Sequence, residues 1–267
     1  MNKKNRPEIP NQMKREVRKR CYFGCIHCGN PLIEYHHIKP WSEVCMHEAK
    51  NITLLCSQCH RKVTQGLYAR EQVIEWNENP YNKNEVYSPA EMLGYKLFKP
   101  EDIEKIQVEI SNAKFNVKMI DTQLQNSIMI PIMIDGEPIV AFTVINGRLS
   151  LYLKLFDENN KVAVEIVNNE VITRLDFWDI TFTGKTLKIN RKSRDIFIEI
   201  DFNAPYSIHI RKGYLMYNQK GFRVYSDHIK SLEDNIQLSN VTFTNLFVGI
   251  SMGELSENMS AGVVIES

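Results

Sequence analysis

Long apolar runs are missing from this 267-residue sequence, and their absence limits where the protein can reside. The longest apolar stretches, such as 127–134, fall far short of the roughly 20 residues that a membrane-spanning helix needs. The N-terminus MNKKNRPEIPNQMKREVRKR is basic but leads into no apolar segment, so we recognise no secretion signal. We therefore expect a cytoplasmic protein with no membrane partner.

Cysteine is absent from the last 208 residues, because all six cysteines lie within the first 59. A secreted protein would spread its disulfides through its domains, whereas clustered thiols in a reducing compartment more often hold a metal ion. Two CxxC pairs, Cys25/Cys28 and Cys56/Cys59, are separated by 27 residues, and each can present two sulfurs to one tetrahedral ion. The spacing predicts a structural Zn²⁺ site rather than four small buried side chains.

Two further cysteines, Cys21 and Cys45, have no vacancy to fill in a four-thiolate site. We expect both to pack as small apolar side chains.

Charge is unevenly divided along the chain. Residues 1–70 carry 13 Lys and Arg against 5 Glu, a net +8, and the remaining residues carry 20 against 27, a net −7. A basic segment beside an acidic one indicates that the first part meets a polyanion, although charge alone is also compatible with a solvated surface.

Two patterns divide the chain. Short helices are predicted at 12–20 and 68–78, the second ending before Pro80 because the residue before proline disfavours helix. Beyond residue 105 the pattern changes to period two, with hairpin turns expected at 135–136, 146–147, 159–160 and 184–185. We therefore expect an α+β chain: a small domain over 1–80, a linker or wrapped arm over 81–104, and an antiparallel all-β sandwich or barrel-like domain over 105–267.

The β region lacks a glycine-rich phosphate loop, a nucleophile elbow and a metal cluster. It is expected to act as a sensor, an assembly module that makes a homo-oligomer, or a target-recognition module. Its aromatic residues Trp178, Phe182, Phe197 and Phe202 follow strand periodicity and are expected in the core.

Three motifs remain between and around the cysteine pairs: CxxC, then HHIxP at 36–40, then NIxxLCxxCH at 51–60. This succession resembles the HNH endonuclease family over about residues 14–80. The resemblance implies a ββα-metal fold, in which a hairpin and a helix surround one catalytic divalent ion. It also implies roles: His37 as general base, His36 and His60 as ligands of the catalytic ion, and Asn51 as the residue that orients the base.

The chemistry of phosphodiester hydrolysis agrees with two different tasks for the neighbouring histidines. Successive side chains of a strand point to opposite faces, so His36 and His37 can serve different partners. An imidazole can deprotonate water, and a cation can stabilise the charge that develops on the phosphate and the leaving oxygen. Mg²⁺, Mn²⁺, Ni²⁺ and Zn²⁺ all suit such a site. His27 is expected to face solvent or a sulfur, and His47 to lie in the connecting loop with a third-ligand role left open.

Basic residues flank the motifs and predict contacts with DNA phosphates. The expected phosphate-binding residues are Arg15, Arg18, Lys19, Arg20, Arg61 and Lys62.

Two functions follow from these features. One is a metal-dependent endonuclease that hydrolyses phosphodiester bonds in DNA, in a bacterial restriction or phage-defence setting. The other is a non-catalytic zinc-dependent nucleic-acid-binding protein in which the histidine pair is structural and the β domain recruits a partner.

Overall fold

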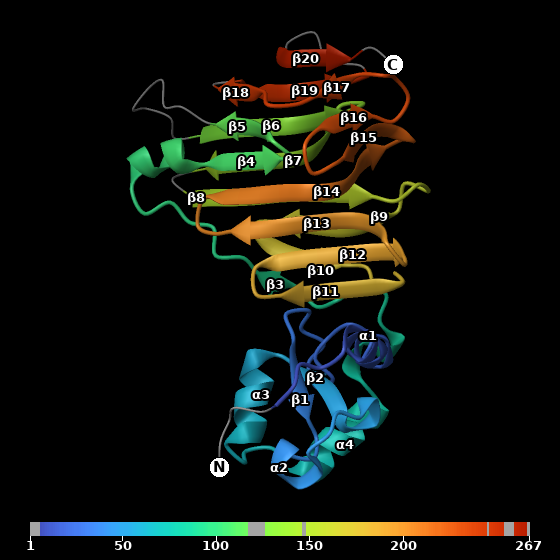
Figure 1. The fold of residues 1–267 in the computed structure, drawn as a ribbon. Helices are drawn as coiled ribbons and strands as arrows, with labels where there is room; N and C mark the ends of the chain where they lie inside the picture. The colour runs from blue at the N-terminus through green and yellow to red at the C-terminus, as the bar shows by residue number, and fades with distance from the viewer. Residues whose placement is uncertain (1–5, 117–125, 146–147, 245, 254–258, 266–267) are drawn as a thin grey trace. The chain divides into compact units, whose positions relative to one another are not determined.

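The chain folds into two compact units (Figure 1). The computed structural model describes residues 6–116, 126–145, 148–244, 246–253 and 259–265. Unit 1 consists of the chain up to Glu91 together with 174–184 and 189–193, and unit 2 contains 92–173, 185–188 and the chain from Arg194 onward. Unit 1 is therefore built from three separate stretches of sequence.

The helices of unit 1 include both of those that the sequence predicts. Helix α1 begins at Asn11 after Pro10, and helix α4 ends at Glu78 before Asn79-Pro80. The elements are α1 (Asn11–Arg20), β1 (Glu34–His37), α2 (Trp41–Val44), η2 (Ala49–Asn51), β2 (Ile52–Leu55), α3 (Ser57–Thr64), α4 (Arg70–Glu78) and η3 (Tyr81–Asn84).

A hairpin and a helix form the centre of unit 1. Strands β1 and β2 pair antiparallel, with His36 opposite Thr53 and His37 opposite Ile52. Helix α3 follows β2 after one residue and packs against both strands. The apolar residues of β2 are buried in a core that also receives Val17 from α1. This order of strand, strand and helix is the ββα arrangement that the sequence motifs imply.

The segment after α4 contacts the first CxxC loop. The Asn82 side-chain amide donates to the backbone carbonyls of Gly29 and Tyr22, at 3.1 and 3.2 Å. The Tyr81 backbone N–H donates to the Ile26 carbonyl at 3.0 Å. Residues 80–84 thus follow the loop closely instead of leaving it.

Most of the remaining chain is strand, as expected from its period-two pattern. Over the described residues, one sheet has eight strands in the order β20-β19-β6-β7-β8-β9-β10-β3 and a second has ten, with β11 to β17 in sequence order. The first sheet contains β3 (Glu91–Met92), β6 (Asn126–Ile134), β7 (Glu137–Ile145), β8 (Arg148–Phe156), β9 (Val162–Val167), β10 (Glu170–Thr173), β19 (Val248–Met252) and β20 (Ala261–Ile265). The second contains β4 (Gln107–Ile110), β5 (Ala113–Asn116), β11 (Asp179–Thr183), β12 (Thr186–Lys192), β13 (Asp195–Asn203), β14 (Ser207–Tyr217), β15 (Lys220–Val224), β16 (Ile229–Ser231), β17 (Gln237–Leu238) and β18 (Thr242–Thr244). A further 3₁₀-helix, η4 (Pro100–Lys105), precedes β4.

The two sheets pack face to face within unit 2, where β14 contacts β7 and β8. Strands β6, β7, β8 and β9 pair antiparallel in sequence order, which agrees with the predicted sandwich. Among the described strands, four pairs are parallel, namely β4 with β14, β5 with β18, and β19 with both β6 and β20. Each of these joins segments that no tight turn connects, so the hairpin signals of the sequence could not reveal them.

The predicted turns can be compared with the structure at three of the four positions. Asp135 and Gly136 connect β6 to β7 with positive φ angles of 46° and 77°, which a two-residue hairpin turn requires. Gly184 (φ 57°) begins the turn between β11 and β12, and Asn160 (φ 57°) lies in the loop between β8 and β9. The fourth expected turn, at 146–147, lies outside the described residues.

The aromatic residues expected in the core divide into two groups. Phe182, Phe197 and Phe202 are buried, as predicted. Trp178 is only half-buried, which corrects the expectation for that residue, because the Arg15 guanidinium covers its ring instead of apolar side chains. None of the described helices is long and apolar enough to cross a membrane.

Candidate metal centre and histidine pocket

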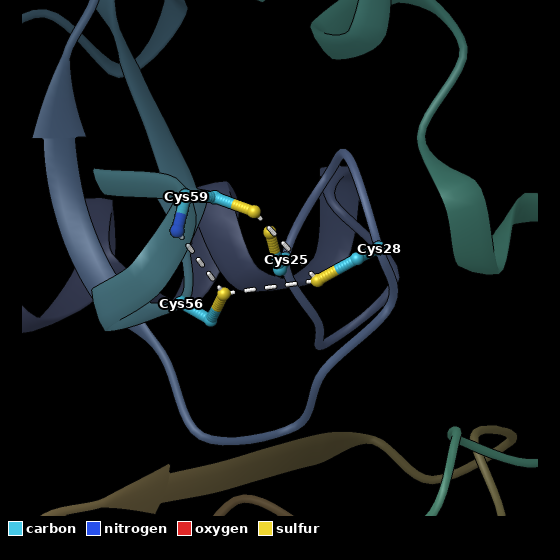
Figure 2. A group of neighbouring side chains, drawn as sticks. All are labelled: Cys25, Cys28, Cys56 and Cys59. Atoms are coloured by element: carbon cyan, nitrogen blue, oxygen red, sulfur yellow. Dashed lines mark hydrogen bonds between the residues drawn. The ribbon is translucent and has the colours of Figure 1, made fainter. Parts of the chain in front are cut away.

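The four cysteines of the CxxC pairs converge on one point (Figure 2). Their sulfur atoms all lie within 4.8 Å of one another, and two sulfur–sulfur distances are 3.7 Å (Cys28 to Cys56) and 3.9 Å (Cys28 to Cys59). A tetrahedral zinc site with bonds of about 2.3 Å has sulfur–sulfur distances of about 3.8 Å. Both distances therefore match those of a tetrahedral Zn²⁺ site.

The protonation of these thiols supports the same assignment. Burial, together with the neighbouring Cys56 thiol, raises the pKa of Cys59 to about 12. A hydrogen bond to Cys25, followed by burial, raises the pKa of Cys28 well above its ordinary value. Four crowded sulfurs cannot all become thiolates without a cation between them, so the cluster has the electrostatics of a metal site.

Backbone geometry presents the sulfurs from two directions. In the first pair, the Gly29 N–H donates to the Cys25 carbonyl at 2.8 Å and closes the CxxC turn. Gly29 has φ +73°, and a Cβ there would lie 2.4 Å from the Asn82 amide oxygen, so this position requires glycine. In the second pair, the Cys56 sulfur caps the start of α3 by accepting from the Cys59 N–H at 3.5 Å.

His60 follows Cys59 directly and is placed by the same turn of helix. Its backbone N–H donates to the Cys56 carbonyl at 2.8 Å. Its ring lies edge-on to the ring of His36, with centroids 5.0 Å apart. The two histidines expected to bind the catalytic ion are therefore brought together, one from β1 and one from the first turn of α3.

A carboxylate that none of the sequence motifs predicts lies beside this pair. Glu34, the first residue of β1, places its Oε2 atom 2.7 Å from His60 Nδ1. Glu34 and His36 are two residues apart on the strand, so both side chains lie toward α3. That spacing was visible in the sequence, but exposed glutamates are too common to single one out.

His37 contacts a different set of residues. The Arg6 guanidinium donates to His37 Nδ1, and His37 Nε2 lies 3.1 Å from His47 Nδ1. His47 Nε2 in turn lies 2.8 Å from the Pro7 carbonyl oxygen. The structure thus places His47 beside the expected base and away from the His36–His60 pair.

Asn51 clamps the backbone immediately after His37. Its side-chain oxygen accepts from the Lys39 N–H at 2.7 Å, and its side-chain amide donates to the Lys39 carbonyl at 3.2 Å. Its own carbonyl accepts from the Ile38 N–H at 2.9 Å. Because Asn51 is buried, these contacts fix the point where the chain leaves β1.

Both central histidines are neutral near pH 7. Burial, then the proximity of His60, His37 and Arg6, lowers the pKa of His36 to about 4. Burial, then the charge of Arg6 and the proximity of His47, lowers the pKa of His37 to about 4. Neutral imidazoles carry the lone pair that a metal ligand or a general base needs.

A pocket of about 460 Å³ opens above these residues. His36, His37 and His60 all line it, with Arg6 and Trp41 among the other side chains at its wall. The expected base and both expected ligands therefore face the same pocket. Arg6 and Glu34 were absent from the predicted site because neither belongs to the recognised motifs.

Arg18 and Arg20, two of the expected phosphate-binding residues, are hydrogen-bonded within the fold of unit 1. Arg18 is buried and forms a two-point ion pair with Asp179, with distances of 2.8 and 2.6 Å, and also donates to Tyr35. Burial alone would lower the pKa of Arg18, but these partners outweigh it and raise the pKa above its ordinary value. Arg20 donates to the backbone carbonyls of Ala49 and Ile52.

The other basic residues differ in their surroundings. The Arg15 guanidinium stacks 3.5 Å from the centroid of the Trp178 ring. Lys19, Arg61 and Lys62 are exposed, and Lys62 also lies 3.4 Å from the Tyr68 hydroxyl. Arg61 and Lys62 directly follow His60 on α3, so two exposed cations lie on the same helix as a residue of the pocket.

Cys21, Cys45 and His27 lie near the cysteine cluster in sequence but have different surroundings. Cys21 is buried as expected, and burial raises the pKa of its thiol. Cys45 is exposed, which corrects the packing expectation: it ends α2 in a left-handed conformation that faces solvent. His27 lies against the Trp76 ring, with centroids 4.1 Å apart.

Comparison with known proteins agrees with this geometry. Residues 25–66 match the family model described as HNH endonuclease. The matched stretch begins at Cys25 and includes the four cysteines, the adjacent histidines, Asn51 and His60. This part of the chain is therefore an HNH domain, of a family whose members are generally nucleases. No curated protein and no solved structure matches the chain.

Proposed function

We propose that this protein is a metal-dependent endonuclease that hydrolyses phosphodiester bonds in DNA. The observation that carries the proposal is the convergence of His36, His37 and His60 on one pocket inside the segment that matches the HNH family. Asn51 adds support, because its clamp on Lys39 holds the backbone that follows His37.

In this proposal His37 accepts the proton of the attacking water. Its hydrogen-bond chain has one consistent direction: the Pro7 carbonyl can only accept, so a neutral His47 carries its proton on Nε2 and accepts with Nδ1. His37 then carries its proton on Nε2 and keeps the lone pair on Nδ1, where Arg6 donates. Activation of water requires Arg6 to leave that nitrogen, and a phosphate oxygen is the stronger acceptor for a guanidinium.

His36 and His60 are proposed to hold the catalytic divalent ion, for which Mg²⁺, Mn²⁺, Ni²⁺ and Zn²⁺ are the candidates. When bound, such an ion stabilises negative charge on the phosphate and the leaving oxygen. The low pKa of His36 supports this role, because a protonated imidazole cannot be a ligand. Cys25, Cys28, Cys56 and Cys59 hold a separate structural Zn²⁺ ion in this proposal.

DNA is the proposed substrate, and the exposed cations Lys19, Arg61 and Lys62 are proposed to contact its phosphates. Arg15, Arg18 and Arg20 are proposed to contribute mainly by shaping that surface, since each has a partner in unit 1.

The cysteines are all free thiols in the structure, which supports the reducing cytoplasm as the compartment. The separate β-rich unit supports a setting in which cleavage is directed or restrained, such as restriction or phage defence.

Plasmid nicking tests the proposal. Zinc-loaded protein is incubated with supercoiled plasmid and added Mg²⁺, Mn²⁺ or Ni²⁺, and the His37→Ala variant serves as the comparison. Cleavage by the wild type that His37→Ala abolishes is the expected result. Tight DNA binding with no cleavage under any ion would instead favour the non-catalytic zinc-dependent binding protein.

A further inference from the structure

We infer that Glu34 is a positioning residue that holds His60 with Nε2 free for the catalytic ion. The inference rests on the proposed function, because it assigns a task to Glu34 through His60. The observation behind it is the 2.7 Å contact between Glu34 Oε2 and His60 Nδ1 at the junction of β1 and α3.

The local fold brings the two side chains together. Glu34 begins β1 and lies opposite Leu55, the last residue of β2, and α3 starts two residues later. His60 is therefore carried back over the first residue of β1 by the first turn of the helix. His36 lies two residues along the strand from Glu34, and its ring also contacts the His60 ring, with a distance of 5.0 Å between the centroids.

The backbone of His60 is fixed independently of Glu34. Its N–H donates to the Cys56 carbonyl, and its preceding residue, Cys59, belongs to the cysteine cluster. What the backbone leaves undetermined is the rotation of the imidazole ring and the nitrogen that carries its proton. Glu34 contacts the atom that decides both.

The chemistry of the contact selects one tautomer. An ionised carboxylate has no hydrogen to donate, so His60 Nδ1 must carry the proton that lies between the two groups. The lone pair of the neutral ring is then on Nε2. A carboxylate on the far nitrogen of a ligand histidine orients the ring and increases its basicity, and loss of such a partner typically costs about 10- to 100-fold in metal affinity.

Two observations separate this role from simpler ones. Among the described residues, three or more potential metal-ligand atoms come close together only in the cysteine cluster. Glu34 therefore does not form a three-ligand site with His36 and His60 in this structure. The side chains of His60 and Glu34 are 34% and 51% exposed, and an ion pair that exposed contributes little stability. Orientation of the ring, rather than stabilisation of the fold, is what the contact supplies.

Nitrogen NMR of the full-length, zinc-loaded protein without a second cation tests the tautomer. Long-range ¹H–¹⁵N spectra, assigned with His60→Ala, should show the His60 proton on Nδ1 in the wild type. Glu34→Gln should keep that tautomer, because the amide oxygen still accepts, and Glu34→Ala should move the proton toward Nε2. Glu78→Gln removes a similar charge from α4 outside the pocket lining and should change nothing. A His60 tautomer unchanged in Glu34→Ala would overturn the inference.

Calorimetric titration of the same zinc-loaded proteins with Mn²⁺ separates this inference from the proposed function. Glu34→Ala should weaken Mn²⁺ binding about 10-fold or more, with Glu34→Gln intermediate and Glu78→Gln unchanged. If His60→Ala weakens binding but Glu34→Ala leaves it within twofold of the wild type, the positioning role is wrong and the ligand assignment stands. If His60→Ala itself leaves Mn²⁺ affinity unchanged, the ligand assignment in the proposed function fails, and the role of Glu34 fails with it.

Discussion

His36 and His37 are neighbours in the chain, yet the structure gives them different partners. The His36 ring contacts His60 of α3, whereas His37 contacts Arg6 and His47. His37 lies between Arg6 and His47 in a hydrogen-bond chain, whereas His36 is half of a histidine pair, so the two imidazoles are suited to different chemistry. The proposed division of labour between base and ligand therefore has a geometric counterpart at the scale of single residues.

Removal of the proposed base should separate catalysis from ion binding. His37→Ala is expected to lower the cleavage rate by about 10²- to 10⁴-fold, the range that general acid–base catalysis supplies. Its Mn²⁺ affinity should stay near that of the wild type, because His36 and His60 remain.

His36→Ala is the matched comparison, since it should weaken Mn²⁺ binding and recover part of its activity at high ion concentration. Plasmid nicking and calorimetry measure the two quantities. Equal losses of Mn²⁺ affinity in both variants would contradict the separation.

The sequence could supply some of the site residues and not others. His36, His37, Asn51 and His60 belong to a spaced motif, so the resemblance alone was enough to nominate them. Arg6 and Glu34 belong to residue types that are common on protein surfaces, and only the three-dimensional contacts single them out. The basic residues show the opposite case, because a run of positive charge does not reveal that Arg18 points inward to Asp179.

At the scale of elements, α3 links the cysteine cluster to the pocket. Cys56 caps the helix, Cys59 belongs to the cluster, and His60 is the next residue. The first turn of α3 therefore places Cys59 in the proposed zinc site and His60 at the wall of the pocket. The position of His60 should depend on an ion that takes no part in the chemistry.

Loss of the proposed structural zinc should disorganise the HNH part of the chain, residues 25–66. Cys56→Ser is expected to lose close to one zinc ion per chain and to expose the HNH part to proteolysis, because the ion is its principal cross-link. The strands of unit 2 should persist in circular dichroism, since their core lies elsewhere. Elemental analysis, limited proteolysis and circular dichroism measure these effects.

Cys45→Ser provides the control, because Cys45 is exposed and outside the cluster. A Cys56→Ser protein that retained its zinc and its protease resistance would show that the cluster is not a metal site.

The ion pair between α1 and β11 should be important for the stability of unit 1. Arg18→Ala leaves the buried Asp179 carboxylate without its partner, and breaking a buried pair in this way typically costs about 3–5 kcal/mol of unfolding free energy. Lys19→Ala, one residue along the helix, removes an exposed cation and should change stability by less than about 0.5 kcal/mol. Urea denaturation of both variants makes the comparison, and equal midpoints would show that the pair contributes no stability.

The prediction of elements succeeded where the signal was local. The start of α1 follows from Pro10 and the end of α4 from Pro80. The turn at 135–136 follows from the Asp-Gly pair. Parallel pairing of β4 with β14, or of β19 with β6, depends on contacts between segments far apart in the sequence. Strand periodicity specifies which side chains are buried on a strand, but it does not specify the neighbouring strand.

At the scale of the whole molecule, charge should decide how DNA binding depends on salt. Each phosphate that a cation neutralises contributes about −0.9 to the slope of log affinity against log salt concentration. The triple variant Lys19→Ala/Arg61→Ala/Lys62→Ala should therefore make that slope shallower by up to about 2.7 and weaken binding at low salt.

Three exposed lysines of unit 2 form the control: Lys114, Lys161 and Lys212. Their alanine variants should bind DNA as the wild type does in filter binding across a salt series. A larger effect from the unit 2 triple would indicate that the β-rich unit itself reads DNA.

Whole-chain variants suit this question better than fragments. Unit 1 includes 174–184 and 189–193, so a fragment that ends at residue 80 lacks Asp179 and deprives Arg18 of its carboxylate partner. Weak binding by such a fragment would report its poor folding and not its contacts with DNA. The boundary of the functional part is set by contacts across the sequence and not by position along it.

The discontinuity of unit 1 also affects the order of events on the ribosome. Asp179 is made 161 residues after Arg18, which at about 5–20 residues per second is a delay of roughly 10–30 s. During that interval the nascent chain already contains every histidine of the pocket but lacks the carboxylate that neutralises the buried end of α1. We therefore expect the packing around Arg18 to be completed only after β11 has emerged.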